Sequence, residues 1–245
     1  MEERIKEIIS IFIHIPVSEI TGETRLDRSA VGNSIKLHRM YAKIAEAGFP
    51  VSDYGSIVSY SQLIRRIEGA SQGTEIDYRD WRDDSLVSGD YTPGLHIGVD
   101  VENIAALPRV ADFREDVFYI QNFSPEEIAY CICQPDPYTS FAGLFAAKEA
   151  IVKADSRYKA VPFNKIVIDH LDSGKPVTDN FNLSISHTDL IAVAVALQVD
   201  AVDSISINNN SDVNAIPMGS GNRVIRLAIA ALVLSLIALV LVLLR

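Results

Sequence analysis

Cysteine and basic charge are both scarce in this chain of 245 residues, and each shortage excludes a class of protein. Two cysteines, Cys131 and Cys133, cannot build a disulfide framework, and a C-x-C pair without nearby histidine or further cysteine makes a poor zinc site. We therefore expect a reducing compartment. The 22 lysines and arginines stand against 32 acidic residues, for a net charge of −10. We expect no nucleic-acid partner, because neutralising phosphates requires a basic face.

Apolar residues are plentiful by contrast, at 48% of the chain, and this composition excludes wholesale disorder. The charge divides unevenly, with a net charge of 0 over residues 1–69, −4 over 70–93, −7 over 94–200 and +1 over 201–245. Polar, turn-forming sequence over 70–93 and Asn/Ser/Gly-rich sequence over 201–222 predict two linkers. The predicted organisation is therefore a first domain over 1–69, a second over 94–200 and a tail over 223–245.

The tail contains eighteen residues, Leu227–Leu244, whose only polar member is Ser235. About 20 apolar residues cross a bilayer as a helix, so we expect a single transmembrane helix that anchors the chain in a membrane. The alternative is a buried helix of a water-soluble protein, which would need a large core on every side. Arg223 and Arg226 flank the near end of the span, and no apolar signal segment begins the chain. We expect the N-terminal domains in the cytoplasm.

The first 69 residues have the pattern of a small helical bundle. Apolar residues recur at helical spacing from Ile5 to Ile13, and Pro16 ends that helix. A second helix begins at Gly32-Asn33-Ser34 after a long polar loop, and a third covers residues 61–67. Asn33 or Ser34 is expected to cap the second helix by accepting its free amides.

This arrangement resembles an acyl or peptidyl carrier protein over essentially the whole of residues 1–69. The matching segments are the first helix, the loop Ser18-Glu-Ile-Thr-Gly-Glu-Thr-Arg-Leu, the Gly-x-Ser-Ile step, Ala47-Gly-Phe-Pro-Val and Ser59-Tyr-Ser-Gln-Leu-Ile. The resemblance implies that Ser34 carries 4′-phosphopantetheine. The positive end of the helix dipole favours such a phosphate. An ordinary helix cap is the alternative role of Ser34. The second helix is basic, with Lys36, His38, Arg39 and Lys43, where carriers are usually acidic.

Residues 94–200 change to a pattern of strands and helices that predicts an α+β domain. We expect strands over 95–101, 166–168, 181–186 and 191–197 from their alternating, β-branched residues. Ser124-Pro-Glu-Glu opens a helix as a capping box with proline at its first position. A longer helix is expected over 138–154.

Two acidic clusters carry the chemistry of this half. Asp100 and Glu102 share one face of a strand end, and Lys148-Glu149 is followed by Lys153 one helical turn later. Carboxylates beside lysines suggest a site for magnesium and a pyrophosphate. Taken singly, these residues are equally typical of a strand-end turn and of a surface ion pair.

In their order, five motifs resemble the 4′-phosphopantetheinyl transferase superfamily, most closely the small holo-acyl-carrier-protein synthase type. The motifs are Ile97-Gly-Val-Asp-Val-Glu, Phe123-Ser-Pro-Glu-Glu-Ile-Ala-Tyr-Cys, Phe145-Ala-Ala-Lys-Glu-Ala-x-x-Lys-Ala, Ser173-Gly-Lys-Pro and Leu183-Ser-Ile-Ser-His-Thr. The family's usual arginine before Phe-Ala-Ala-Lys-Glu is Leu144 here.

The resemblance implies a role for each of these residues. Asp100 and Glu149, with Glu102 as an additional ligand, would hold Mg²⁺ together with the pyrophosphate of coenzyme A. Lys148 and Lys153 would contact phosphate oxygens, and Lys175, Pro176, Ser186 and His187 would line the nucleotide end. His187 is equally typical of a hydrogen-bonded histidine at a strand edge. The reaction transfers phosphopantetheine to a carrier serine and releases 3′,5′-ADP, with Glu149 accepting the serine proton through a water.

The chain thus resembles a carrier joined to an enzyme that primes carriers. Our first hypothesis is that it transfers phosphopantetheine from coenzyme A to Ser34, in cis or between protomers. Tethering raises the effective concentration of the acceptor. Alternatively, the carrier-like domain is a docking module that is never primed while the transferase serves separate carriers. A third hypothesis is that the transferase half has lost activity and recruits coenzyme A or a partner. The resemblance also implies a homotrimer.

Overall fold

The computed structural model describes residues 1–51, 54–70 and 94–199 of the chain. The predicted linker over 70–93, apart from its first residue, the predicted linker over 201–222 and the predicted anchor over 223–245 therefore lie outside the described residues. Within the described part, no helix is long and apolar enough to span a membrane. Met1–Val202 form one compact unit, so no break in packing separates the two predicted domains.

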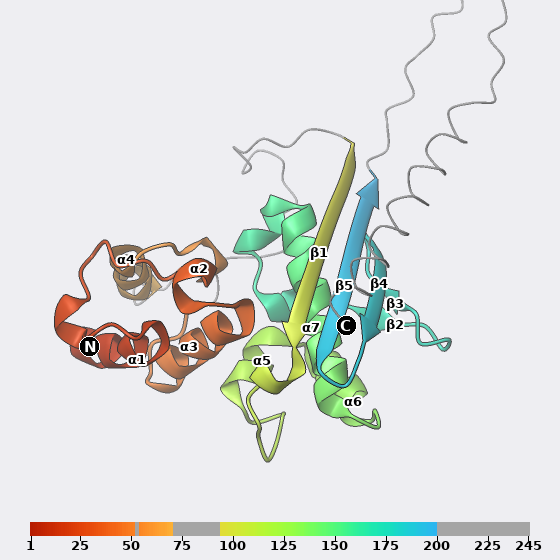
Figure 1. The fold of residues 1–245 in the computed structure, drawn as a ribbon, viewed down its shortest axis with the longest axis horizontal. Coiled ribbons are helices and arrows are strands. Elements are labelled where there is room, and N and C mark those ends of the chain that lie inside the picture. Colours follow the sequence, from red (N-terminus) through yellow and green to blue (C-terminus); the bar gives the residue numbers. More distant parts are fainter. Residues whose placement is uncertain (52–53, 71–93, 200–245) are drawn as a thin grey trace, which may run out of the picture. The chain divides into compact units, whose positions relative to one another are not determined.

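The first 70 residues form a helical module, as the sequence predicts (Figure 1). Its helices are α1 (Glu2–Ile13), α2 (Arg28–Val31), α3 (Ser34–Glu46) and α4 (Tyr60–Ala70). Apolar residues at helical spacing form its core, which includes Ile5, Ile9, Leu26, Ile44 and Leu63, all fully buried. The short helix α2 lies within the stretch that the sequence predicts as a loop.

A tight turn between α2 and α3 leads the chain into Asn33 and Ser34. Asp27 caps α2, because its carboxylate accepts the Ala30 amide at 3.1 Å. Gly32 ends α2 with φ at +108°, a conformation that side chains with a Cβ rarely adopt. This turn leads directly into Asn33 and α3, so Arg28 and Ser34 are only a tight turn apart along the chain.

The second half is an α+β structure, which confirms the predicted class. It contains β1 (Leu95–Asn103), α5 (Val117–Asn122), α6 (Pro125–Ile132), α7 (Pro137–Ala154), β2 (Asp169–His170), β3 (Pro176–Val177), β4 (Asn182–His187) and β5 (Ile191–Val199). The strands β1, β5 and β4 form an antiparallel sheet in that order, and β2 pairs with β3. The predicted capping box at Ser124 and Glu127 is present at the start of α6.

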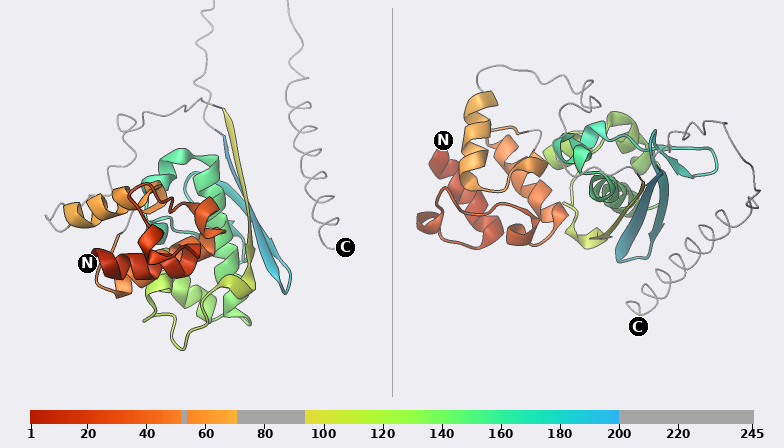
Figure 2. Two further views of the ribbon diagram at one scale, coloured as in Figure 1. Left: turned by 60° about the vertical axis from the view of Figure 1, so that its left-hand side comes forward. Right: turned by 90° about the horizontal axis from the view of Figure 1, so that it is seen from above.

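Helix α7 packs against one face of the sheet (Figures 1 and 2). The inner positions carry small residues, Gly98 on β1 and Ala192, Ala194 and Ala196 on β5, all of them buried. On the outer face Leu95, Val101 and Val199 are about half exposed, at 54%, 47% and 64%. The sheet therefore has one packed face and one apolar face that the described residues leave open to solvent.

The segment at 166–168 does not form the predicted strand. Ile166 and Ile168 are buried, as an alternating pattern requires, but the Ile168 amide donates to Glu127 Oε1 at 2.9 Å instead of to a neighbouring strand. The short hairpin of β2 and β3 follows it. The sequence prediction was wrong here because a buried glutamate, rather than a strand, satisfies the backbone.

The helical module packs into the core of the second half through α3. Ile35 and Ala42 belong to the same cluster of buried residues as Phe118 on α5 and Phe145 on α7. Gly55 of the module also lies close to the other half, since a Cβ there would stand 2.6 Å from the Lys159 carbonyl oxygen. The two halves thus share a contiguous apolar contact.

Candidate functional site

Ser34 occupies the first position of α3, and its hydroxyl is not used as a helix cap. The cap is Asn33, whose side chain accepts the Lys36 amide at 2.8 Å. Ser34 is 1% exposed, and within the described residues its Oγ has no hydrogen-bond partner. The alternative interpretation of Ser34 as an ordinary cap is therefore wrong, and a buried hydroxyl without a partner needs another explanation.

Three predicted carboxylates lie on the elements that meet at this serine. Asp100 and Glu102 extend from the inner face of β1 and are buried, and Glu149 lies on the facing helix α7. Burial and Asp100 raise the pKa of the Glu149 carboxyl, and Ser34 lies close enough for its side chain to oppose that rise. The structure therefore brings together the predicted attachment site and the predicted acidic cluster.

The acidic cluster has raised pKa values. Burial and then the neighbouring Asp100 raise the pKa of Glu149 to about 7. Burial, followed by repulsion from Asp100 and Glu149, raises the pKa of Glu102 to about 8. Asp100 Oδ2 and Glu102 Oε1 are buried without a hydrogen-bond partner among the described residues. A group of buried like charges with unpartnered oxygens favours binding of a cation.

Two cationic side chains contact this cluster. Lys153 Nζ lies 2.6 Å from Asp100 Oδ1 and 3.0 Å from the Val99 carbonyl oxygen, which places this predicted residue beside the acids. Arg28 reaches the cluster from the helical module, with Nη2 3.3 Å from Asp100 Oδ1 and Nη1 3.6 Å from Glu149 Oε2. Sequence reasoning missed Arg28 because no motif distinguishes it from other polar residues of its loop.

His38 on α3 also reaches Glu149 across the contact between the halves. Its Nε2 lies 3.7 Å from Glu149 Oε1, and its Nδ1 contacts Asn122 Oδ1 and, at 3.0 Å, the Tyr54 hydroxyl. Burial lowers the pKa of His38 to about 4, so the ring is neutral at physiological pH. The sequence shows the basic character of this helix but not that a histidine enters the site.

Lys148 does not lie in the site, and its predicted contact with phosphate is wrong. The side chain is completely buried, and Nζ donates to Glu127 Oε2 at 2.6 Å and to the Asn122 and Phe163 carbonyl oxygens at 2.8 Å. An ammonium has three N–H donors, so none is left for a ligand. Lys148 instead fixes α7 to α6, to the end of α5 and to the short 3₁₀ helix Phe163–Lys165.

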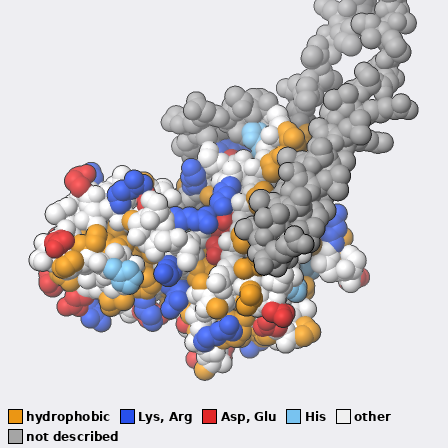
Figure 3. Space-filling model, viewed as in Figure 1, with side chains coloured by type: hydrophobic (Ala, Val, Ile, Leu, Met, Phe, Trp, Pro, Cys, Tyr) orange, Lys and Arg blue, Asp and Glu red, His pale blue; other side chains and the backbone are white. Residues whose placement is uncertain are grey.

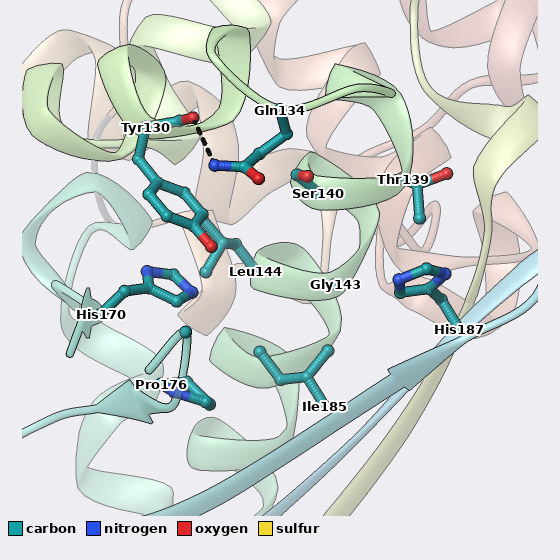
Figure 4. A pocket seen from close by; sticks show the side chains of 11 residues that line it. Tyr130, Gln134, Thr139, Ser140, Gly143, Leu144, His170, Pro176, Ile185 and His187 are labelled. Atoms are coloured by element: carbon teal, nitrogen blue, oxygen red, sulfur yellow. Dashed lines mark hydrogen bonds between the residues drawn. The ribbon is translucent and has the colours of Figure 1, made fainter. Parts of the chain in front are cut away.

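A cavity of about 230 Å³ lies between the start of α7, the β2–β3 hairpin and β4 (Figure 4). Pro176 and His187, both predicted for the nucleotide end, line it, as does Leu144. Tyr130 and His170 stack with ring centroids 3.8 Å apart on one side of the cavity, and His187 points in from β4. The cavity shares no lining residue with the acidic cluster.

Two other residues predicted for the nucleotide end do not line this cavity. Lys175 is exposed in the turn of the hairpin, between the lining residues Gly174 and Pro176. Ser186 lies on the outer face of the sheet, because its neighbours Ile185 and His187 line the cavity and adjacent strand residues point to opposite faces. Ser186 therefore does not line this cavity, and its predicted place at the nucleotide end stays a prediction.

The acidic cluster does not form a complete metal site from protein ligands alone. Within the part of the chain that the structure describes, no three His, Cys, Asp or Glu side chains are arranged to hold a metal ion. The assignment of Asp100 and Glu149, with Glu102 as an additional ligand, to Mg²⁺ stays a prediction. The unpartnered oxygens of Asp100 and Glu102 still suit Mg²⁺, which takes one or two carboxylates together with water and phosphate oxygens.

The surface around this site is basic as well as acidic. Figure 3 shows lysine and arginine side chains gathered where the helical module meets the second half, with acidic side chains among them. Arg39 of α3 adds a direct contact, because its Nη1 donates to the Ala106 carbonyl oxygen at 3.1 Å. The contact between the halves therefore combines apolar packing with paired charges.

Comparison with solved structures finds chains similar to the second half. A holo-(acyl-carrier-protein) synthase from Bacillus anthracis in complex with CoA (3′,5′-ADP) is 28% identical, with a TM-score of 0.37, over 43% of this chain and 96% of that one. A holo-[acyl-carrier-protein] synthase from Helicobacter pylori in complex with coenzyme A is 30% identical, with a TM-score of 0.36, over 41% of this chain and 96% of that one.

Curated relatives match the same portion of the chain by sequence. The holo-[acyl-carrier-protein] synthase of Chlorobaculum tepidum is 34% identical over an alignment of 113 residues, and the match covers 42% of this chain and 97% of the relative. The fatty acid synthase subunit alpha of Saccharomyces cerevisiae is also 34% identical, over 119 residues, but the match spans only 6% of that protein. The family model described as 4′-phosphopantetheinyl transferase superfamily matches residues 96–196. The chain belongs to this superfamily, and it is a phosphopantetheinyl transferase of the holo-[acyl-carrier-protein] synthase type.

Proposed function

We propose that this chain transfers 4′-phosphopantetheine from coenzyme A to Ser34 of its own helical module. The observation that carries the proposal is the buried Ser34 hydroxyl, which has no hydrogen-bond partner among the described residues and lies beside Glu149 of the transferase half. The helical bundle with a serine opening α3 supports the carrier-like interpretation of residues 1–69.

The proposed step is attack of Ser34 Oγ on the phosphorus that bears pantetheine. The new Oγ–P bond forms as the pyrophosphate P–O bond breaks, and 3′,5′-ADP leaves with the electron pair. Glu149 accepts the serine proton, directly or through a water. In the metal-free chain its pKa is raised to about 7, chiefly by burial, and a general base works best when its pKa is near the working pH.

Asp100 and Glu149, with Glu102 beside them, are the residues that would hold Mg²⁺, which supplies neutralisation of charge on the transferring phosphate. Lys153 is poised to add a further positive charge, since its side chain is 39% exposed and its ammonium is already beside Asp100. The helix N-terminus at Ser34 favours the phosphate that the serine receives.

The cavity lined by Pro176 and His187 is proposed to bind the nucleotide end of coenzyme A. It shares no lining residue with the acidic cluster, but its residue His187 on β4 and Glu102 on β1 both pair with Ala192 of β5, so the two sites lie on the same face of the sheet. The apolar outer face of the sheet, with Leu95, Val101 and Val199, supports the proposed homotrimer. Light scattering of the detergent-solubilised chain tests it, and a monomer with full activity would exclude it.

The test of self-priming is to incubate the full chain with coenzyme A and Mg²⁺ and to record its intact mass. The wild-type chain should gain the mass of one phosphopantetheine, and tandem mass spectrometry should place the group on Ser34. Chelation of the metal should abolish the gain.

Two variants separate self-priming from its alternatives. Ser34→Ala should gain no mass yet still load a separate carrier protein, whereas Glu149→Gln should load neither. A wild-type chain that loads the separate carrier but never itself would show that the helical module is only a docking module. A Glu149→Gln chain as active as the wild type would remove Glu149 from the mechanism.

We also propose that Leu227–Leu244 anchors the protein in a membrane, with both domains on the cytoplasmic side. The proposal rests on the apolar sequence of these residues, which lie outside the described part of the chain. Resistance to alkaline extraction from membranes, lost on deletion of 223–245, is the expected result. A full-length chain that stays in the aqueous fraction would exclude the anchor.

A further inference from the structure

His38 of the helical module inserts its ring into the second half of the chain. It lies on α3 between Ile35 and Ala42, which belong to the buried core of that half, and residues three or four positions apart share one face of a helix. His38 itself is 4% exposed. A polar side chain buried in such an apolar contact makes recognition specific, because it requires a matching partner.

Three residues of the second half form a slot for this ring. Phe145 of α7 and Phe163 of the 3₁₀ helix Phe163–Lys165 make T-shaped contacts with the imidazole, at centroid distances of 4.8 Å and 4.3 Å. Asn122, at the end of α5, faces His38 Nδ1 with its side-chain oxygen Oδ1. We call Phe145, Phe163 and Asn122 the histidine slot.

Asn122 is oriented by contacts within the second half. Its Nδ2 donates to the Phe118 carbonyl oxygen at 2.7 Å, and its own carbonyl oxygen accepts from Lys148 Nζ at 2.8 Å. These bonds turn Oδ1 toward the module, and because Oδ1 can only accept, His38 Nδ1–H is the donor. The slot therefore presents a fixed acceptor, to which an incoming carrier has to bring a donor.

Among the described residues, both donors to Asn122 Oδ1 come from the helical module. The second is the Tyr54 hydroxyl at 3.4 Å, and the Tyr54 ring stacks on Tyr41 of α3 with centroids 4.3 Å apart. Asn122 is completely buried, so a carrier with an aliphatic side chain here would leave Oδ1 without a donor. Sites built around a buried hydrogen bond reject partners that lack the matching group.

The slot acts separately from the acidic cluster. His38 Nε2 lies 3.7 Å from Glu149 Oε1, which is beyond hydrogen-bonding distance, whereas Nδ1 contacts both Asn122 and the Tyr54 hydroxyl. All three residues of the slot are neutral. It therefore distinguishes acceptors by shape and hydrogen bonding, whatever the net charge of the carrier.

We infer that the transferase half selects its acceptor by the side chain four residues after the acceptor serine, and that the histidine slot favours the histidine of its own module there. The inference rests on the proposed transfer to Ser34, because His38 follows that serine by about one turn of the same helix. His38 determines specificity and takes no part in the chemical step. A carrier with an aliphatic residue at this position is then the poorer acceptor.

The test compares His38→Leu with Lys43→Leu in the full chain. Lys43 is a matched control, because its side chain is 59% exposed on the same helix and pairs with Glu46. Each variant competes for coenzyme A with a separate acyl carrier protein that has an aliphatic residue four positions after its serine. Intact mass reports the initial rates of loading of both acceptors. We expect His38→Leu to lower the ratio of self-loading to carrier loading about tenfold, and Lys43→Leu to leave it unchanged.

Two further variants test the hydrogen bond itself. His38→Gln keeps an N–H donor, so its ratio should fall between those of the wild type and His38→Leu. Asn122→Leu removes the acceptor and should lower the ratio as well. In the double variant of His38→Leu and Asn122→Leu the ratio should fall no further than in the single variants, because the two groups form one contact. Fully additive losses would contradict this.

The Hδ1 proton of His38 gives a readout that does not depend on catalysis. A buried Nδ1–H that donates to Asn122 exchanges slowly with water, so nuclear magnetic resonance of the ¹⁵N-histidine-labelled chain should detect it. The signal should be present in the wild type and lost in Asn122→Leu, while circular dichroism reports that the fold is retained. A wild-type chain without this signal would show that His38 does not occupy the slot.

The outcomes distinguish this inference from the proposed function. A wild-type chain that never loads Ser34 contradicts the proposed function, whatever His38 does. Self-loading by the wild type with an unchanged ratio in a folded His38→Leu chain overturns the inference alone. Equal loss of self-loading and carrier loading in that variant also overturns it, since His38 would then serve the reaction rather than the choice of acceptor.

Discussion

A Cβ atom on Gly98 of β1 would lie 1.8 Å from the carbonyl oxygen of Ala150 on α7. Strand and helix therefore touch through their backbones at this point, and the acids Asp100 and Glu149 lie beside the contact, on β1 and α7. We expect Gly98→Ala to force the two elements apart, lowering the free energy of unfolding by about 1–3 kcal/mol or more, as overpacking does. Transfer activity should fall with it, because the acids separate. Denaturant unfolding and the loading assay measure both.

Gly69→Ala is the control for that substitution. Gly69 lies near the end of α4, and a Cβ added there would have no heavy atom within 4 Å, so alanine fits freely. Its stability should be unchanged or slightly higher, since alanine favours helix over glycine. A Gly98→Ala chain as stable and active as this control would contradict the close contact.

Because Lys148 pairs with Glu127 in the core, we expect replacement of Lys148 to lower the stability of the fold. A lysine that bound phosphate would instead affect the binding of coenzyme A. Lys148→Met leaves Glu127 buried without its cation, which typically costs about 3–5 kcal/mol. The melting temperature should drop sharply, and the double variant Lys148→Met with Glu127→Gln should recover part of it. Lys159→Met, at an exposed lysine, should have no effect. If Lys148→Met had an unchanged melting temperature and a raised KM for coenzyme A, Lys148 would be a coenzyme A-binding residue after all.

The raised pKa values of the acids predict that stability falls between about pH 6.5 and pH 8 in the absence of metal. Glu102 titrates near 8 and Glu149 near 7 when folded, against 4.5 in the unfolded chain, so the folded state keeps protons that the unfolded state loses. The unfolded chain begins to lose these protons above pH 4.5, so their contribution to stability begins to fall there. His38 makes stability rise with pH, but only below about pH 6.5. Its pKa is lowered from 6.5 in the unfolded chain to about 4 in the folded one, so there the unfolded chain binds the proton more tightly.

Thermal unfolding measured from about pH 5 to about pH 9 checks this expectation. Each group contributes up to about 1.4 kcal/mol per pH unit, and Glu102→Gln should flatten the decline above about pH 6.5. Stability that stays level or rises across that range in the metal-free chain would mean that the acids are ionised without penalty.

The cavity predicts a difference between two adjacent residues of β4. His187→Ala removes a side chain that lines the cavity and should raise the KM for coenzyme A about tenfold, equivalent to about 1.4 kcal/mol, with a smaller change in kcat. Ser186→Ala alters the opposite face of the strand and should behave as the wild type in steady-state kinetics. The reverse pattern would move nucleotide binding to the outer face of the sheet.

Much of the fold could be predicted because its signals are local. Helices α1, α3 and α7 follow from apolar spacing and the start of α6 from its capping box, since each depends on residues within a few positions. The strand prediction for residues 166–168 failed because the Ile168 amide donates to the side chain of Glu127, which is distant in the sequence. Helix α5 has a cap at Asp116 but is too short to show a period.

The site was predictable to the extent that it consists of motifs. Asp100, Glu149 and Lys153 were found from their pattern, and the structure places them together with Ser34. Lys148 has the same residue type and motif as a phosphate ligand, and only its burial reveals a structural role. Arg28 and His38 enter the site from another part of the chain, and the spacing of residues in the sequence does not predict that contact.

Burial of Ser34 limits how often one chain can use its tethered acceptor. The hydroxyl is 1% exposed, so the proposed transfer requires the module to move relative to the carboxylates to admit coenzyme A and to release the loaded serine. If the proposed transfer to Ser34 takes place, self-loading is a single-turnover event, because each chain offers one Ser34, and its burst amplitude should equal the number of chains. Any later cycle draws its acceptor from a second molecule at the ordinary bimolecular rate, and the kinetic advantage of the tether ends after the first.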